Sequence, residues 1–287
     1  MCDQIHYDDD KQAAELEGLV TRKQFGKLLG AGVAMMLPQV ANAATVTESE
    51  VNIMTPDGTA DSYFVHPAAG TAPGVLLWPD IFGLRDAKRK MAKRLAESGY
   101  SVLVVNPFYR KQKAPTASKG AATPIPELMP LAQALTETTH MTDAKAFVAW
   151  LDKQASVAKN PKMGTQGYCM GGPMALRTAA AAPDRVGAAA SFHGGGLATD
   201  KPNSPHLQAS KTKAQFLIAI AENDDKRAPN DKTALKETFE KAHLAAEIEV
   251  YEGAAHGWCP PDSRVYNEAL AEKAWARLLA LYGKALA

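Results

Sequence analysis

The residues GYCMGG at positions 167–172 place a cysteine between glycines, where a predicted strand (163–168) runs into a predicted helix (171–182). The pattern G-x-C-x-G has the form of a nucleophile elbow, in which the nucleophile occupies a strained turn between strand and helix. Only small residues fit two positions before and after such a nucleophile, because larger ones would collide with neighbouring backbone. The stretch predicts that Cys169 is a nucleophile, whereas a lone cysteine is more often an inert buried thiol.

Strands and helices are predicted to alternate from residue 44 onward. Residues 51–67 contain a Pro-Asp-Gly turn between two short strands, which is typical of a hairpin. The apolar runs GVLLW (74–78) and SVLVV (101–105) are typical of strands buried on both faces, and further strands are predicted at 186–192, 214–221 and 246–251. Helices are predicted at 86–98, 127–154 and 232–243 and from about residue 267. This order predicts an α/β fold with a mostly parallel sheet and helices on both faces.

The first 43 residues are predicted to be an export signal that is removed, leaving residues 44–287 as one domain. TRKQFGK (21–27) is followed by an apolar segment at 28–37, and Ala41 and Ala43 form an A-x-A cleavage pattern. The basic segment resembles a twin-arginine signal in which Lys23 replaces the second arginine. Ten apolar residues are too few for a membrane anchor, which needs about 20. We therefore expect a periplasmic or secreted protein, or a cytoplasmic one if the segment is not an export signal.

Composition narrows the class of partner. The 32 Lys and Arg residues nearly balance the 31 Asp and Glu residues, so no nucleic-acid partner is expected and a small molecule is the better candidate. Three cysteines at positions 2, 169 and 259 suggest neither a disulfide framework nor a thiolate zinc site. No metal or organic cofactor is implied.

A nucleophile of this kind needs a base and an acid, which follow it in chain order. His256 lies in the glycine- and alanine-rich loop after the strand at 246–251, at the sheet edge where such sites gather. The acid is expected after the strand at 214–221, where both Asp224 and Asp225 are candidates for orienting the histidine. His193 follows the strand at 186–192 and is expected to line the pocket or to pack structurally.

Four motifs together resemble the dienelactone hydrolase family, which are cysteine hydrolases of the α/β-hydrolase fold. They are WPDIFGL (78–84), GYCMGG (167–172), ENDDKRAP (222–229) and YEGAAHGW (251–258). The resemblance implies hydrolysis of an ester or lactone through a thioester. It makes Cys169 the nucleophile, His256 the base and Asp224 or Asp225 the acid. It also implies that the oxyanion hole consists of the N–H groups of Ile81 and Met170.

The sequence differs from the family pattern in two respects. Asp80 replaces the family's glutamate that holds the resting thiol, and it is assigned the same role here with a side chain one methylene shorter. The family's dienelactone members bind a substrate carboxylate with two arginines. Here Pro260 stands at one of these positions, and the loop that supplies the other has lysines 111, 113 and 119 beyond Arg110. We therefore expect neutral, apolar substrates in a pocket lined by Phe82, Tyr109, His193 and Trp258.

Three other classes of protein share some of these sequence features. Class I glutamine amidotransferases also have a cysteine elbow but need a glutamate two residues after the histidine, and no histidine after Cys169 has one. A binding protein without catalytic activity on a hydrolase scaffold is one alternative. A thiol-redox protein that uses Cys169 and Cys259 is another.

Overall fold

The chain forms one eight-stranded sheet in the computed structural model, which describes residues 36–160 and 162–287. The strands β1 (Val46–Thr55) and β2 (Gly58–Pro67) form the predicted antiparallel hairpin. The Thr55 hydroxyl closes the turn, because it accepts from the Asp57 N–H at 3.1 Å and donates to the Gly58 carbonyl at 2.9 Å. The hairpin extends the sheet at the edge next to β4.

Six strands run parallel to one another beyond the hairpin, as their apolar sequences predict. They are β3 (Gly74–Trp78), β4 (Ser101–Val105), β5 (Met163–Tyr168), β6 (Val186–Phe192), β7 (Gln215–Ala221) and β8 (Ala246–Tyr251). The strand order is β1-β2-β4-β3-β5-β6-β7-β8. The chain reverses its winding direction between β3 and β5, and ligands of open α/β sheets bind outside the carboxyl ends of strands at such a switch point. The loop with Ile81 follows β3, and Cys169 follows β5.

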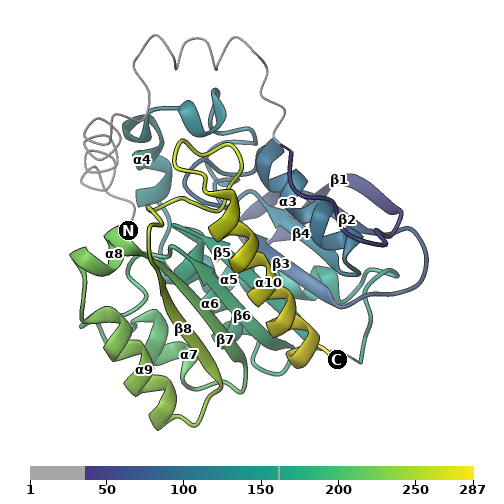
Figure 1. Cartoon of the computed structure of the whole chain (residues 1–287). Coiled ribbons are helices and arrows are strands. Elements are labelled where there is room, and N and C mark those ends of the chain that lie inside the picture. The colour runs from purple at the N-terminus through teal and green to yellow at the C-terminus, as the bar shows by residue number, and fades with distance from the viewer. Residues whose placement is uncertain (1–35, 161) are drawn as a thin grey trace.

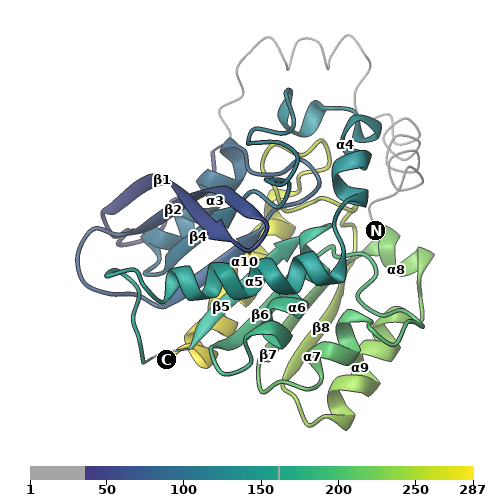
Figure 2. The same cartoon turned by 180° about the vertical axis from the view of Figure 1, so that it is seen from behind.

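Helices cover both faces of this sheet, as predicted. Figure 1 shows α3 (Asp86–Glu97) and α10 (Glu268–Ala285) on one face. Figure 2 shows α5 (Glu137–Leu151) and α6 (Gly171–Ala181) on the other, with α7 (Pro205–Ala209) and α9 (Asp231–Lys241) beside them. Each face has its own buried apolar core, one around Phe147 and Met174 and the other around Leu95 and Leu278.

The prediction of a single helix over 127–154 was wrong in one respect. Two helices occupy this region, α4 (Ile125–Gln133) and α5, and a short 3₁₀ turn, η1 (Gly120–Ala122), precedes them. The break lies at Thr136, whose hydroxyl accepts from the Thr139 N–H while the Thr139 hydroxyl accepts from the Thr136 N–H. This reciprocal cap starts a new helix. α4 lies beyond the carboxyl ends of the strands, on the same side as the loop that contains His256 (Figures 1 and 2).

Residues 1–35 of the predicted export segment lie outside the described residues. Of its last residues, Leu37 packs against the core between α3 and α10. In the part of the chain that the structure describes, no helix has both the length and the apolar character needed to cross a bilayer.

Candidate active site

Cys169 lies in the sharp turn between β5 and α6. Its backbone has φ +53°, which is uncommon for a residue other than glycine, and its N–H donates to the Phe192 carbonyl at 3.0 Å. A Cβ on Gly167 would lie 1.9 Å from the Gly171 carbonyl oxygen, and a Cβ on Gly171 would lie 2.5 Å from the Trp78 carbonyl oxygen. Both glycines are therefore required by backbone contacts, as the elbow pattern predicts.

His256 is held in place by two side chains of α8 (Glu222–Arg227), the short helix that follows β7. Its Nδ1 lies 2.8 Å from Oδ2 of Asp224, and its backbone N–H donates to Oδ1 of Asn223 at 2.8 Å. When Nδ1 donates to Asp224, Nε2 is left as the proton acceptor. Asp225 instead forms an ion pair with Lys232 at 2.7 Å. Of the two candidate acids, the structure brings Asp224 to the histidine.

His193 packs edge-on against His256, with 5.0 Å between the ring centroids. Its backbone has φ +43°, and its N–H donates to the Ala219 carbonyl at 2.8 Å, which places it at the carboxyl end of β6. Only 1% of its surface is exposed, and neither ring nitrogen has a hydrogen-bond partner in residues 36–160 and 162–287. Burial and the neighbouring His256 hold its pKa well below the usual range. His193 is therefore a neutral ring next to the proposed base.

The loop after β3 reaches the first turn of α6. Because Gly171 packs directly on the Trp78 and Pro79 carbonyls, the segment that contains Ile81 is close to Met170. Neither the Ile81 nor the Met170 N–H donates a hydrogen bond to any described residue. Two such donors on adjoining segments match the usual composition of an oxyanion hole.

The four residues expected to line the pocket differ in their burial and in their neighbours. Phe82 is partly exposed and packs with Ile81 against residues of α4. His193 and Trp258 are buried, and the Trp258 ring lies between His193 and Tyr251, with centroids 5.2 Å away on each side. The expectation for Tyr109 was wrong. Its ring belongs to the core and its hydroxyl bonds to Thr55 at 2.6 Å and to Asp143 at 2.8 Å, so it does not form a free pocket wall.

The expectation that Asp80 holds the resting thiol is also not met. Its carboxylate accepts from the Phe82 N–H at 3.0 Å, from Arg85 at 2.7 and 3.1 Å, and pairs with Lys88 at 2.9 Å. Burial opposes ionisation of Asp80, but the charges of Arg85 and Lys88 outweigh it and lower its pKa. The sequence did not reveal this use of the carboxylate, because the two cations lie five and eight residues further on, beyond the loop.

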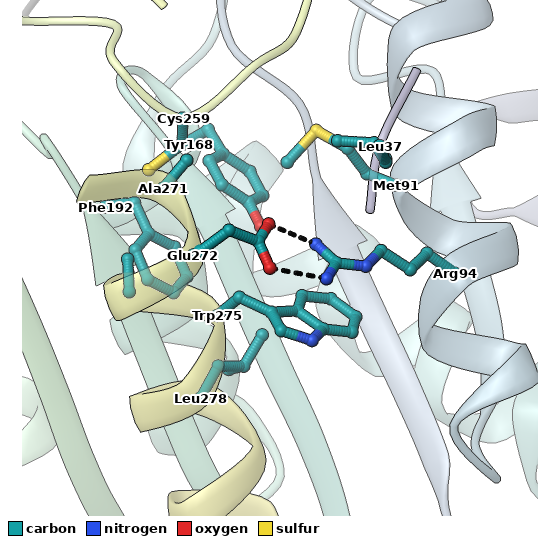
Figure 3. A pocket seen from close by; sticks show the side chains of 11 residues that line it. Leu37, Met91, Arg94, Tyr168, Phe192, Cys259, Ala271, Glu272, Trp275 and Leu278 are labelled. Atoms are coloured by element: carbon teal, nitrogen blue, oxygen red, sulfur yellow. Dashed lines mark hydrogen bonds and ion pairs between the residues drawn. The ribbon is translucent and has the colours of Figure 1, made fainter. Parts of the chain in front are cut away.

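Cys259 lines a pocket between α3 and α10 (Figure 3). The pocket also contains Tyr168 and the pair of Arg94 and Glu272, which share two hydrogen bonds of 2.6 Å. Burial raises the pKa of the Cys259 thiol well above its usual range. Cys259 is a free thiol, so it is not bonded to Cys169. This arrangement does not favour the thiol-redox alternative.

The sequence model of the dienelactone hydrolase family matches residues 60–286. The chain belongs to the dienelactone hydrolase family. It is 26% identical over 253 residues to a carboxymethylenebutenolidase of Rhodococcus opacus, covering 85% of this chain and 96% of that protein. It is 25% identical over 229 residues to a putative carboxymethylenebutenolidase of Salmonella typhi, covering 76% and 80%. A putative dienelactone hydrolase of Klebsiella pneumoniae has a similar fold, with a TM-score of 0.74, 23% identity and coverage of 84% and 99%.

Within the described ranges, no cluster of three or more His, Cys, Asp or Glu side chains is arranged to hold a metal ion. Sequence reasoning missed Arg85 and Lys88, which pair with Asp80, and Asp262, which pairs with Arg85. The one sequence signal for these ion pairs was the charged pattern RDAKRK (85–90), directly after the WPDIFGL motif. That pattern is equally typical of the exposed start of a helix.

Proposed function

We propose that this protein hydrolyses uncharged carboxylic esters or lactones, with Cys169 as nucleophile, His256 as base and Asp224 as the acid that orients the base. That it is a dienelactone hydrolase-like hydrolase follows from its family. The observation that carries the finer proposal is the His256–Asp224 contact of 2.8 Å, at the same sheet edge as the cysteine elbow.

The proposed reaction begins with proton transfer from the Cys169 thiol to Nε2 of His256. The thiolate attacks the carbonyl carbon, and the N–H groups of Ile81 and Met170 donate to the resulting oxyanion. The C–O bond of the ester then breaks, and the leaving alkoxide takes the proton from His256, which yields the alcohol and a thioester. His256 next removes a proton from water, and the hydroxide attacks the thioester. The C–S bond then breaks, the carboxylic acid leaves, and the Cys169 thiolate takes the proton back from His256, which restores the thiol.

Asp224 supports these steps electrostatically. Each proton transfer to His256 creates an imidazolium, which the adjacent carboxylate stabilises while it holds the ring in one orientation. Only the thiol form of Cys169 can be deprotonated and attack, so assays need a reductant such as dithiothreitol.

The preference for uncharged substrates is supported by the state of the nearby cations. Arg110, the candidate anchor for a carboxylate, donates two hydrogen bonds of 2.7 Å to Asp143 and also pairs with Asp57 at 2.6 Å. Arg85 and Lys88 are already paired with carboxylates. To bind Arg110, Arg85 or Lys88, a substrate carboxylate would have to displace an internal partner such as Asp143 or Asp80. That partner would stay buried without its counter-charge, which is costly.

The wall next to the oxyanion loop is apolar. Ile81 and Phe82 pack with side chains of α4 and the segment before it, namely Ala117, Ile125, Leu128, Met129, Leu131 and Ala132. Several of these side chains remain partly exposed. An apolar acyl or alcohol group would gain about 25 cal/mol for each Å² that it buries against them.

A panel of neutral esters and lactones, assayed with reduced protein, tests the proposal. Wild type should hydrolyse at least one of them, and Cys169→Ala and His256→Ala should each lower kcat by at least about 10³-fold without unfolding the protein. Full activity in either variant would refute the mechanism. Binding of panel members without turnover by wild type would instead favour the binding-protein alternative.

A further inference from the structure

The guanidinium of Arg85 is enclosed by two carboxylates from different loops. Its Nη1 and Nη2 donate to Asp80 at 2.7 and 3.1 Å, and its Nε and Nη2 donate to Asp262 at 2.6 and 2.8 Å. A fifth hydrogen bond runs from Nη1 to the Gly83 carbonyl at 3.3 Å. An arginine has five N–H donors, so every donor of Arg85 is used.

Each of the two carboxylates belongs to a loop with a proposed catalytic group. Asp80 precedes Ile81 and accepts from the Phe82 N–H at 3.0 Å, so its position is coupled to the backbone of the oxyanion loop. Asp262 lies six residues after His256, in the loop between β8 and α10. Arg85 therefore connects the loop that would bind the oxyanion to the loop that carries the base.

The surrounding charges balance. Lys88 completes the group, with Nζ 2.9 Å from Asp80, so two cations face two carboxylates. Arg85 and Lys88 have side-chain exposures of 5% and 0%, while Asp80 and Asp262 have 6% and 15%. Buried ion pairs are often no more stabilising than well-packed apolar residues, because the desolvation penalty offsets the attraction. A contribution to stability alone is therefore a weak reason for this arrangement, whereas its bidentate geometry constrains both loops.

We propose that Arg85 is a positioning residue that holds the Ile81 loop and the His256 loop in register by binding Asp80 and Asp262 together. This proposal rests on the proposed function, since it assigns Arg85 a role in the same active site. Arg85 does not touch the reacting atoms in this role. It sets the distance between the oxyanion donors and the base, and a misplacement of about 1 Å can cost about 100-fold in rate.

Asp262→Asn is the main test variant, because it keeps the side-chain shape but removes the charge and one of the two acceptors. We expect kcat to fall by about 10- to 100-fold, with KM changed by less than about threefold, since the substrate contacts remain. Arg85→Lys should show a similar loss although it keeps the charge, because an ammonium cannot bridge two carboxylates in a fork.

Glu272→Gln is the matched control. It breaks a bidentate pair between α3 and α10, in which Arg94 donates two hydrogen bonds of 2.6 Å to Glu272. Its thermal stability should fall about as much as that of Asp262→Asn, but its kcat should stay within about twofold of wild type, because it connects two helices rather than the two loops. Equal effects of the two variants on kcat would overturn the proposal and leave Arg85 with a structural role only.

Hydrogen–deuterium exchange separates this inference from the proposed function. In Asp262→Asn, peptides from both loops, 79–85 and 252–263, should exchange faster than in wild type, although only the second contains the substitution. Unchanged exchange at 79–85 would overturn the coupling, whatever the activity. If exchange is faster in both loops of Asp262→Asn but wild type hydrolyses no ester or lactone, the coupling is supported and the proposed function is refuted.

Discussion

Replacing Asp224 with asparagine isolates the electrostatic contribution of the acid to the proposed mechanism. The carboxylate lies 2.8 Å from Nδ1 of His256, and the two side chains are only 12% and 9% exposed. The charge centres of such a pair are about 4 Å apart, and at an effective dielectric constant of about 20 their attraction is about 4 kcal/mol. This attraction exists only while His256 carries the proton, so its loss raises the barrier. We expect kcat to fall by roughly 10³-fold in Asp224→Asn.

Asp225→Asn is the matched control, because it makes the same chemical change at the next residue. Asp225 pairs with Lys232, whose side chain is 37% exposed, and exposed pairs of this kind contribute about 0.2–1 kcal/mol to stability. The measurement is kcat and kcat/KM for one neutral ester between pH 6 and 8, with reductant present and the fold checked by circular dichroism. Losses of similar size in both variants, or a larger loss in Asp225→Asn, would refute the assignment of Asp224.

Four further predictions concern specificity, stability and processing. For two substrates that differ only by a free carboxylate, kcat/KM should be at least about tenfold lower for the anionic one, since a missing charge-paired contact is worth about 1.5–3 kcal/mol; a preference for the anion would contradict this. Asp80→Asn should lower the free energy of unfolding, measured by urea denaturation, by a constant amount from about pH 8 to 5. Below about pH 4 this loss should shrink, because a lowered pKa stabilises the fold only while the unfolded-state carboxyl is ionised. A loss that shrinks as the pH rises would contradict the prediction. Gly171→Ala should destabilise the protein by about 1–3 kcal/mol, because the added carbon overlaps the Trp78 carbonyl. Gly283→Ala has nothing within 4 Å of the added carbon and should stabilise the protein by about 0.5–1 kcal/mol, and thermal melts compare the two variants. Mass spectrometry of protein from its own host should find a mature N-terminus near Ala44, and an intact Met1 would refute export.

The sequence by itself determined the architecture, because the signals for it are local. Continuous apolar runs such as 74–78 and 101–105 are typical of strands that are buried on both faces, and the alternation with helical segments then implies a parallel sheet. The elbow was predictable because its residues are adjacent in the sequence, and Gly167 is required by the backbone of Gly171 and Gly172, a few residues away. Gly171, in contrast, is required by the Trp78 and Pro79 carbonyls, which only the fold brings next to it.

Tertiary structure decided which polar side chains meet, because a contact depends on the direction in which each side chain points. Asp224 and Asp225 have identical side chains, but successive residues of a helix point about 100° apart, so α8 directs one to His256 and the other to Lys232. The neighbours of Asp80 depend in the same way on how the loop after β3 folds, which brings two buried cations to a carboxylate that the sequence assigned to the thiol. Adjacent residues share their sequence context but not their direction in space, and direction determines which groups can interact.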